Sequence, residues 1–279
     1  MIRLHPILLS HIQNLIMSKP SKVHVVLVHG AWHNASTWDS LRQHLDKAGF
    51  PNSAINLPSV GGKGDPHPDH SQDVATIRAE YERVINEGRD VIAIFHSYGG
   101  QPGSEACQGL SKAERTAQGK KGGIIHTIYR ASMMLKPGQS VTGNAMEAFK
   151  AAGRMPKFKG VNLELVPGWL WMTDDDAARS MYSEMDREAA MPYVREMAPQ
   201  SPGPLMAPLG YAPWMNGMPT TYVLAELDEV VEPWLQEKMV EAKEFKGKVV
   251  RVKAQHCFYA THQEEIVEVV KEAAKSSAA

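Results

Sequence analysis

A serine, an aspartate and a histidine stand far apart in the chain, and each follows a stretch that is predicted to form a β-strand. They are Ser97, Asp228 and His256. A serine hydroxyl becomes a nucleophile near neutral pH when a histidine takes its proton, and a carboxylate fixes the tautomer of that histidine. Because the carboxyl ends of parallel strands lie on one edge of a sheet, the three side chains are expected to meet there. The sequence therefore predicts a nucleophilic serine.

The residues around Ser97 predict an abrupt change from strand to helix. The unbroken apolar run 91–95 is typical of a central parallel strand that is covered on both faces. Residues 98–100, Tyr-Gly-Gly, then open a helix without room for a long loop. Such a turn lifts the serine hydroxyl clear of the sheet, as in a nucleophile elbow with the consensus G-x-S-x-G. Phe95 stands at the first glycine position, so the motif is matched in part, and a serine in an ordinary turn is the alternative.

The proposed acid and base have neighbours of the same type. Glu226 and Glu229 flank Asp228, which is favoured because it lies nearest the centre of the turn and tight turns suit Asp. The other histidines considered are His29, His33, His67, His70, His96 and His262. His29 and His33 follow the first strand and could border the pocket. His96 should point away from the neighbouring hydroxyl, because successive residues of a strand face opposite sides.

A tetrahedral oxyanion needs two backbone N–H donors aimed at one point. Tyr98 follows the nucleophile at the start of a helix, where the helix dipole helps. Gly30 allows a close backbone approach in the loop after the first strand. The N–H groups of Ala31 and Tyr98 are therefore the predicted oxyanion donors.

Strand-like and helix-like segments alternate through much of the chain, which predicts an α/β fold with a mostly parallel sheet flanked by helices. Strands are expected at 23–28, 53–57, 91–95, 124–129, 220–225 and 248–254. Helices are expected at 36–47, 71–87, 98–118, 233–242 and 263–274.

The alternation stops at residues 137–217, which are rich in Met and Trp. Helices are expected there at 144–152, 174–190 and 192–197. An apolar insertion between sheet strands favours a helical lid over a pocket, although a small helical subdomain with its own core is the plainer alternative. The expected core is residues 21–136 and 218–279, and residues 1–20 are expected to be a loosely attached leader.

The composition excludes several classes of protein. The chain has 279 residues, a net charge of −1 and two cysteines, Cys107 and Cys257. The balanced charge gives no support for a nucleic-acid partner, and two cysteines give no disulfide framework or cysteine-rich zinc site. No apolar run is long enough to span a membrane. We therefore expect a cytoplasmic protein that acts on a small molecule.

Two stretches carry a resemblance to a known family. Residues 26–33, VLVHGAWH, with Trp38 downstream, and residues 96–100, HSYGG, resemble the α/β-hydrolase superfamily. The chain most resembles the branch of plant methyl-ester esterases, hydroxynitrile lyases and their fungal and bacterial relatives, over about residues 23–271. The resemblance implies the α/β-hydrolase fold and a Ser97, Asp228 and His256 triad that needs no metal or organic cofactor.

Departures from the family pattern bear on the reaction. The lyases that the chain resembles carry Thr and Lys where this chain has Gly30 and Cys257. In those lyases the positive charge of the lysine stabilises the cyanide. Because this chain has no cation at that position, the resemblance favours hydrolysis. Haloalkane dehalogenases and epoxide hydrolases of this fold have Asp at the position of Ser97. They therefore resemble the chain less.

The expected function is hydrolysis of a small, largely apolar carboxylic ester or lactone through an acyl-enzyme. Tryptophans that could shape the pocket, or belong to the plain core, are Trp32, Trp169, Trp171 and Trp214. Two alternatives remain: a lyase or C–C bond hydrolase that uses the same pocket, and a non-catalytic receptor for a small apolar ligand. The oligomeric state is open, with a homodimer included.

Overall fold

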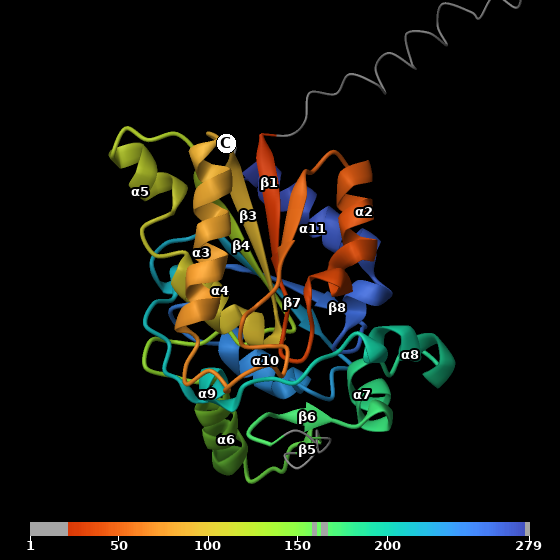
Figure 1. Ribbon diagram of the computed structural model, residues 1–279. Helices are drawn as coiled ribbons and strands as arrows, with labels where there is room; N and C mark the ends of the chain where they lie inside the picture. Colours follow the sequence, from red (N-terminus) through yellow and green to blue (C-terminus); the bar gives the residue numbers. More distant parts are fainter. Residues whose placement is uncertain (1–21, 158–160, 163–166, 277–279) are drawn as a thin grey trace, which may run out of the picture.

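The chain forms a sheet of six parallel strands with helices on both faces. The computed structural model describes residues 22–157, 161–162 and 167–276, and its strands lie in the order β2-β1-β3-β4-β7-β8 (Figure 1). Their bounds are Val23–Val28 (β1), Asn52–Ile55 (β2), Asp90–His96 (β3), Gly123–Arg130 (β4), Thr220–Ala225 (β7) and Lys248–Val252 (β8). Each predicted strand is present, and all neighbouring pairs are parallel. The predicted fold class is therefore confirmed.

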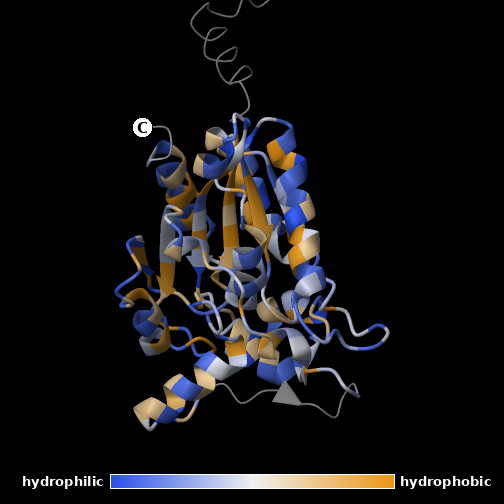
Figure 2. Cartoon of the chain, turned by 90° about the vertical axis from the view of Figure 1, so that its left-hand side faces the viewer, coloured by the Kyte–Doolittle hydropathy of each residue, from blue (hydrophilic) through white to orange (hydrophobic). Residues whose placement is uncertain are grey.

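The central strands bring the ends of distant segments together. In the register of β3 and β4, His96 lies beside Arg130, and in the register of β4 and β7, Arg130 lies beside Val223. All residues of β4 are buried. Figure 2 shows these apolar strands enclosed between helices. Burial on both faces explains why their sequences are continuous apolar runs rather than alternating ones.

Two pairs of helices cover the sheet. On one face, α2 (Asp39–Lys47) packs beside α11 (Gln263–Ser276), and on the other face α3 (Ser71–Asn86) packs beside α4 (Gly100–Ala106) (Figure 1). The other helices of the core are η1 (Ala35–Trp38), η2 (Ser97–Gly99), α5 (Lys112–Ala117), α10 (Pro233–Val240) and η4 (Phe258–Ala260).

The single helix expected at 98–118 is wrong, because the chain turns between α4 and α5. α4 ends at Ala106, and Gly109, with a left-handed φ of 74°, lies in the turn that follows it. Ser111 then caps α5 in a capping box with Glu114, whose carboxylate accepts from the backbone N–H of Ser111.

The segment between β4 and β7 lies beyond the carboxyl ends of the strands (Figure 1). It contains α6 (Val141–Ala152), β5 (Val161–Asn162), β6 (Trp171–Met172), α7 (Asp174–Met181), α8 (Arg187–Arg195), α9 (Pro202–Met206) and η3 (Pro213–Met215). The helix expected at 174–190 is wrong, since Asp186 caps a new helix by accepting from the N–H of Ala189. Pro192, expected to begin another helix, lies inside α8. A lid role for 137–217 stays a prediction, and the predicted leader 1–20 lies outside the described residues.

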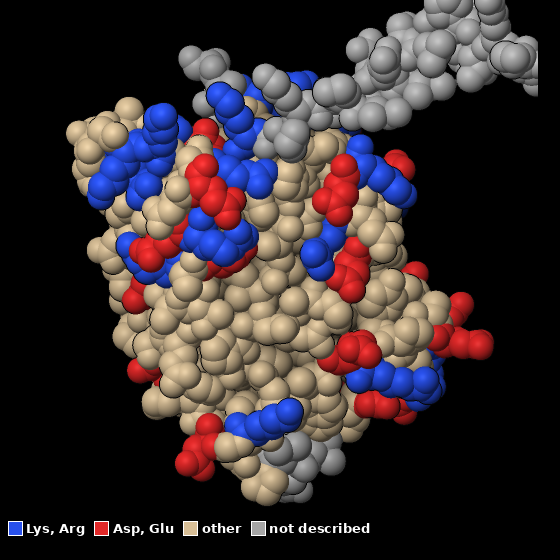
Figure 3. Space-filling view, turned by 45° about the horizontal axis from the view of Figure 1, so that its top comes forward, with Lys and Arg blue, Asp and Glu red and all other residues tan. Residues whose placement is uncertain are grey.

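Charges of both signs share the surface. Figure 3 shows Lys and Arg side chains next to Asp and Glu side chains on the face displayed. On α3, for example, Arg83 forms ion pairs with Glu80 at 2.7 Å and Glu87 at 2.9 Å. Within the part of the chain that the structure describes, no helix is both long and apolar enough to cross a bilayer.

Phe95 fits at the elbow because α4 lacks a side chain opposite it. A Cβ added at Gly103 would lie 2.6 Å from two atoms of the Phe95 ring. The ring also meets Tyr129 edge-on, with centroids 5.0 Å apart. The large residue at 95 is therefore compensated by glycine one turn into the following helix, and the departure from the consensus leaves the turn at Ser97 in place.

This packing predicts an unusual response to a glycine-to-alanine change. In a helix, Gly→Ala normally stabilises by about 1 kcal/mol, but at Gly103 the added methyl group overpacks, so we expect a loss of about 1–3 kcal/mol. Phe95→Ala should cost about 3–5 kcal/mol by leaving a cavity. In urea denaturation, the double variant should be less destabilised than the sum of the single variants. Strictly additive losses would contradict the pairing.

Candidate active site

The structure brings Ser97, His256 and Asp228 into one hydrogen-bonded chain. His256 Nε2 lies 3.0 Å from Ser97 Oγ, and His256 Nδ1 lies 2.8 Å from Asp228 Oδ2. A carboxylate can only accept, so Nδ1 carries the proton and Nε2 is free to accept from the serine hydroxyl. Asp228 and His256 are almost entirely buried. This arrangement can move the serine proton onto the imidazole.

The turn at Ser97 is a strained one. Ser97 has a φ of 53°, in the left-handed region that non-glycine residues rarely adopt. Three donors hold its carbonyl oxygen: the N–H of Gly100, the N–H of Met133 at 3.1 Å and the hydroxyl of Ser132 at 2.8 Å. A Cβ at Gly99 would lie 2.5 Å from the carbonyl oxygen of His29, so the turn also needs glycine there. These contacts offset the cost of the strained conformation.

Asp228 is held by its own turn. Its Oδ1 accepts from the N–H groups of Val230 at 2.8 Å and Val231 at 3.0 Å, and its Oδ2 accepts from Gln236 Nε2 at 3.3 Å. Both competing glutamates face cations elsewhere. Glu226 lies 3.8 Å from Arg251, and Glu229 lies 4.0 Å from Lys157. Of these three acids, Asp228 is the one that contacts His256.

The two predicted oxyanion donors flank the serine. A Cβ at Gly30 would lie 2.7 Å from Ser97 Cβ, so the loop that carries Ala31 passes directly over Ser97. His33 steadies this loop, since its Nδ1–H donates to Ala31 O at 2.8 Å. Tyr98 is the second residue of the 3₁₀-helix η2, which starts at Ser97. The placement is compatible with an oxyanion hole, and that role stays a prediction.

A family model described as the alpha/beta hydrolase family matches residues 25–269, which is most of the chain. The chain belongs to the alpha/beta hydrolase family.

Two relatives in sequence are named as hydrolases. The chain is 24% identical over 266 residues to the alpha/beta hydrolase nvfD of Aspergillus novofumigatus, covering 92% of this chain and 98% of the relative. It is 26% identical over 263 residues to the probable hydrolase R7 of a Phoma species, covering 92% of this chain and 99% of the relative.

Solved structures share the fold over nearly the whole chain. A pyrethroid hydrolase from Sphingobium faniae JZ-2 superposes with a TM-score of 0.67 at 20% identity, covering 92% of this chain and 99% of the other. A methylesterase from Arabidopsis superposes with a TM-score of 0.68 at 20% identity, covering 91% of this chain and 99% of the other. At this level of identity, the likeness establishes the fold.

Within this hydrolase fold, the sequence missed a buried carboxylate below the elbow. Asp73 of α3 accepts from the Tyr98 hydroxyl at 2.5 Å and from the Ser59 N–H at 2.9 Å. Ser59 in turn accepts from Gln200 Nε2 at 3.2 Å. The network therefore connects Tyr98, the residue after Ser97, to the inserted segment. The one sequence signal was that a buried tyrosine hydroxyl needs a partner.

The sequence also missed how closely His96 approaches the proposed base. The His96 and His256 rings lie 4.6 Å apart between centroids, although His96 makes no bond to Ser97 among the described contacts. Cys257 follows His256, and its N–H donates to Met181 O of α7 at 3.0 Å. Burial raises the pKa of the Cys257 thiol to about 12. The thiol is therefore protonated near neutral pH and is a poor nucleophile.

The side chains of His29 and His262 form hydrogen bonds with groups other than the serine. His29 bonds Gly30 O and accepts from the Leu57 N–H, while His262 bonds Glu184 and Glu265 on the surface. Burial lowers the pKa of His29 to about 4. Among the described residues, no group of three or more His, Cys, Asp or Glu is placed to hold a metal ion.

The four tryptophans of the predicted pocket differ in setting. Trp32 and Trp214 are buried, and their indole N–H groups donate to the carbonyl oxygens of Leu170 and Leu135. Trp169 is buried, and Trp171 is half-buried in β6. Trp214 lines a cavity of about 130 Å³ with residues that do not include the triad. Their contact with a substrate stays a prediction.

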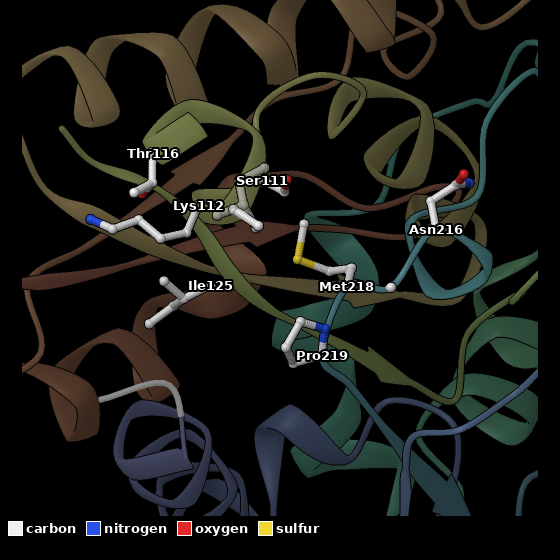
Figure 4. A pocket seen from close by; sticks show the side chains of 10 residues that line it. Ser111, Lys112, Thr116, Ile125, Asn216, Met218 and Pro219 are labelled. Carbon is white, nitrogen blue, oxygen red and sulfur yellow. The ribbon is translucent and has the colours of Figure 1, made fainter. Parts of the chain in front are cut away.

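A cavity of about 470 Å³ lies at the other end of the sheet (Figure 4). Its lining includes Ile124 and Ile125, near the start of β4, and Pro219, just before β7. Ser97 follows the carboxyl end of β3. This cavity is therefore separate from the candidate active site.

Asp73 predicts a specific pH dependence of stability. Burial raises the pKa of Asp73, against hydrogen bonds from Ser59 and Tyr98 that lower it. The folded state thus holds this proton more tightly than the unfolded state, so the stability from Asp73 falls as the pH rises above about 4, the unfolded value. Asp73→Asn removes the ionisable group, so the variant does not lose stability in this way as the pH rises.

In urea denaturation, the stability of Asp73→Asn relative to the native protein should therefore improve between pH 4 and pH 7. Gln72→Ala, on the exposed first turn of α3, is the control and should show a pH-independent difference. A difference for Asp73→Asn that is equally constant would contradict the raised pKa.

Proposed function

We propose that the protein is a serine hydrolase that cleaves a small, largely apolar carboxylic ester or lactone. The observation that carries the proposal is the chain of hydrogen bonds from Asp228 through His256 to Ser97, at a strained turn. Such a chain serves acyl transfer in enzymes of unrelated folds, so it is recognised by geometry rather than by sequence position.

In the proposed mechanism, Ser97 Oγ attacks the carbonyl carbon while His256 Nε2 takes the hydroxyl proton. The tetrahedral oxyanion accepts from the N–H groups of Ala31 and Tyr98. His256 then gives its proton to the leaving alcohol, and an acyl-enzyme forms. Water, activated by the same imidazole, releases the acid and restores Ser97. Asp228 keeps Nδ1 protonated and stabilises the imidazolium.

The names of similar proteins support ester hydrolysis. Two structural relatives are named pyrethroid hydrolase and methylesterase, and a third is a polyneuridine aldehyde esterase variant. The site contains a protonated thiol at Cys257, beside the base, instead of a cation. Cyanide release needs positive charge beside the leaving group, so this position favours hydrolysis over the lyase alternative.

The segment 137–217 is proposed to act as a lid that shapes the pocket. It supplies contacts next to the base, since Tyr182 donates its hydroxyl hydrogen to His33 Nε2 at 2.7 Å and Met181 O accepts from Cys257. Trp32, Trp169, Trp171 and Trp214 would then give the acyl or alcohol group an apolar surface.

Ser97→Ala should lower kcat for p-nitrophenyl acetate by on the order of 10⁶, since the nucleophile is lost. Ser104→Ala is a matched control, because Ser104 is a buried serine of α4 whose hydroxyl bonds Tyr129 on the sheet. Far-UV circular dichroism checks that both variants fold. A fluorophosphonate should label the native protein and the Ser104 variant, but not Ser97→Ala. Undiminished turnover by Ser97→Ala would exclude the proposed nucleophile.

Asp228→Asn should lower kcat by on the order of 10⁴, because the amide favours the wrong imidazole tautomer. Glu226→Gln, two positions earlier and on the surface, should retain native turnover. Steady-state kinetics on the same ester measure both. Equal losses in the two variants would show that Asp228 is not the orienting carboxylate. Analysis of products from cyanohydrins and β-diketones tests the lyase and C–C hydrolase alternatives directly.

A further inference from the structure

Arg130, the last residue of β4, buries a guanidinium group among aromatic rings. Its Cζ lies 3.8 Å from the centroid of the Phe258 ring, 4.7 Å from that of Tyr259 and 5.4 Å from that of Trp38. The residue is 0% exposed. Within the described part of the chain, none of its three guanidinium nitrogens has a hydrogen-bond partner.

Fold stability alone does not explain this residue. Burying a charge without hydrogen bonds or a paired carboxylate costs several kcal/mol, and a well-packed apolar side chain often replaces a buried ion without loss. Burial lowers the pKa of Arg130 to about 10, against Tyr259, Cys257 and Asp228, which raise it. The group is therefore a cation near neutral pH. A methionine could fill the same space between the rings.

The backbone carbonyl and the side chain of Arg130 both support the loop that carries His256. Its carbonyl oxygen accepts from His96 Nδ1–H at 3.1 Å, and this bond orients the ring that packs against His256. Its guanidinium stacks on Phe258 and Tyr259, which follow His256 by two and three positions. Backbone and side chain thus hold the loop from two sides.

The polar groups around the guanidinium are neutral. Burial lowers the pKa of His33 and His96, and burial raises the pKa of Cys257, Tyr182 and Tyr259. None of these five groups is an anion that would attract the guanidinium away from the aromatic rings. Cation–π attraction is strongest where water is excluded. Asp228 is the buried carboxylate whose field reaches it.

We infer that Arg130 is a positioning residue that fixes the 256–260 loop, so that His256 Nε2 stays within hydrogen-bond reach of Ser97. The inference rests on the proposed serine-hydrolase function for its effect on reactivity. Its effect on the loop itself is independent of any reaction.

The test compares Arg130→Met, Arg130→Lys and Tyr129→Phe with the native protein. Tyr129→Phe is the control, because it removes a buried hydroxyl, which bonds Ser104, from the neighbouring residue of the same strand. Three quantities are measured: the free energy of unfolding in urea, hydrogen exchange of the peptide spanning 255–261, and the rate at which a fluorophosphonate labels Ser97.

Arg130→Met is expected to be at least as stable as the native protein and to exchange faster in the loop. Its Ser97 should be labelled at about one tenth of the native rate or below. Arg130→Lys should recover part of the rate, because an ammonium group also binds an aromatic face. Tyr129→Phe should lose stability without faster loop exchange or slower labelling. If Arg130→Met fails to fold, partial loss in Arg130→Lys at native stability supports the inference.

Native loop exchange and labelling in Arg130→Met would overturn the inference. A loss in rate that Tyr129→Phe shows to the same extent at an equal loss of stability would overturn it as well. If the fluorophosphonate does not label the native protein, that result counts against the proposed function. Loop exchange would then decide the role of Arg130: faster exchange in the Met variant supports it, and unchanged exchange refutes it.

Discussion

The left-handed turn at Ser97 is the constraint on which the rest of the site depends. A strained residue of this kind costs about 1–3 kcal/mol and persists only where its surroundings hold it. Here β3 ends and the helical segment begins without a loop, so the loop after β1 and the end of β4 must approach the turn closely. Gly30 and Gly99 allow that approach, and the Ser132 hydroxyl and Met133 N–H hold the Ser97 carbonyl. The serine is therefore exposed by the fold around it.

The buried charges near this turn are each accommodated differently. Asp228 accepts backbone N–H groups from its own turn, whereas Asp73 relies on a tyrosine hydroxyl and one backbone N–H. Arg130 has aromatic faces instead of acceptors. The field of Arg130 reaches His33 and His96, whose burial favours the neutral imidazole. A low-dielectric setting of this kind strengthens the electrostatic interactions among the groups it encloses.

The inserted segment contacts the loops that carry the residues of the candidate site. The carbonyl of Met181 and the hydroxyl of Tyr182 contact the loops of Cys257 and His33, and Gln200 bonds Ser59. Movement of this segment would therefore alter the loop of His256 and the loop of Ala31 together. Apart from a general richness in Met and Trp, nothing in the local sequence indicated these contacts.

The sequence alone determined the strands, their parallel arrangement and the three residues at their ends, because apolar runs and the polar residues that end them are local patterns. It did not determine where helices break, as at Gly109 and Asp186, since caps compete with continuing periodicity. Only the tertiary structure decided that Gly103 makes room for Phe95 and that Arg130 lies between Phe258 and Tyr259. The physical reason is that such contacts join segments far apart in the chain, and each residue's own neighbourhood carries no trace of its partner.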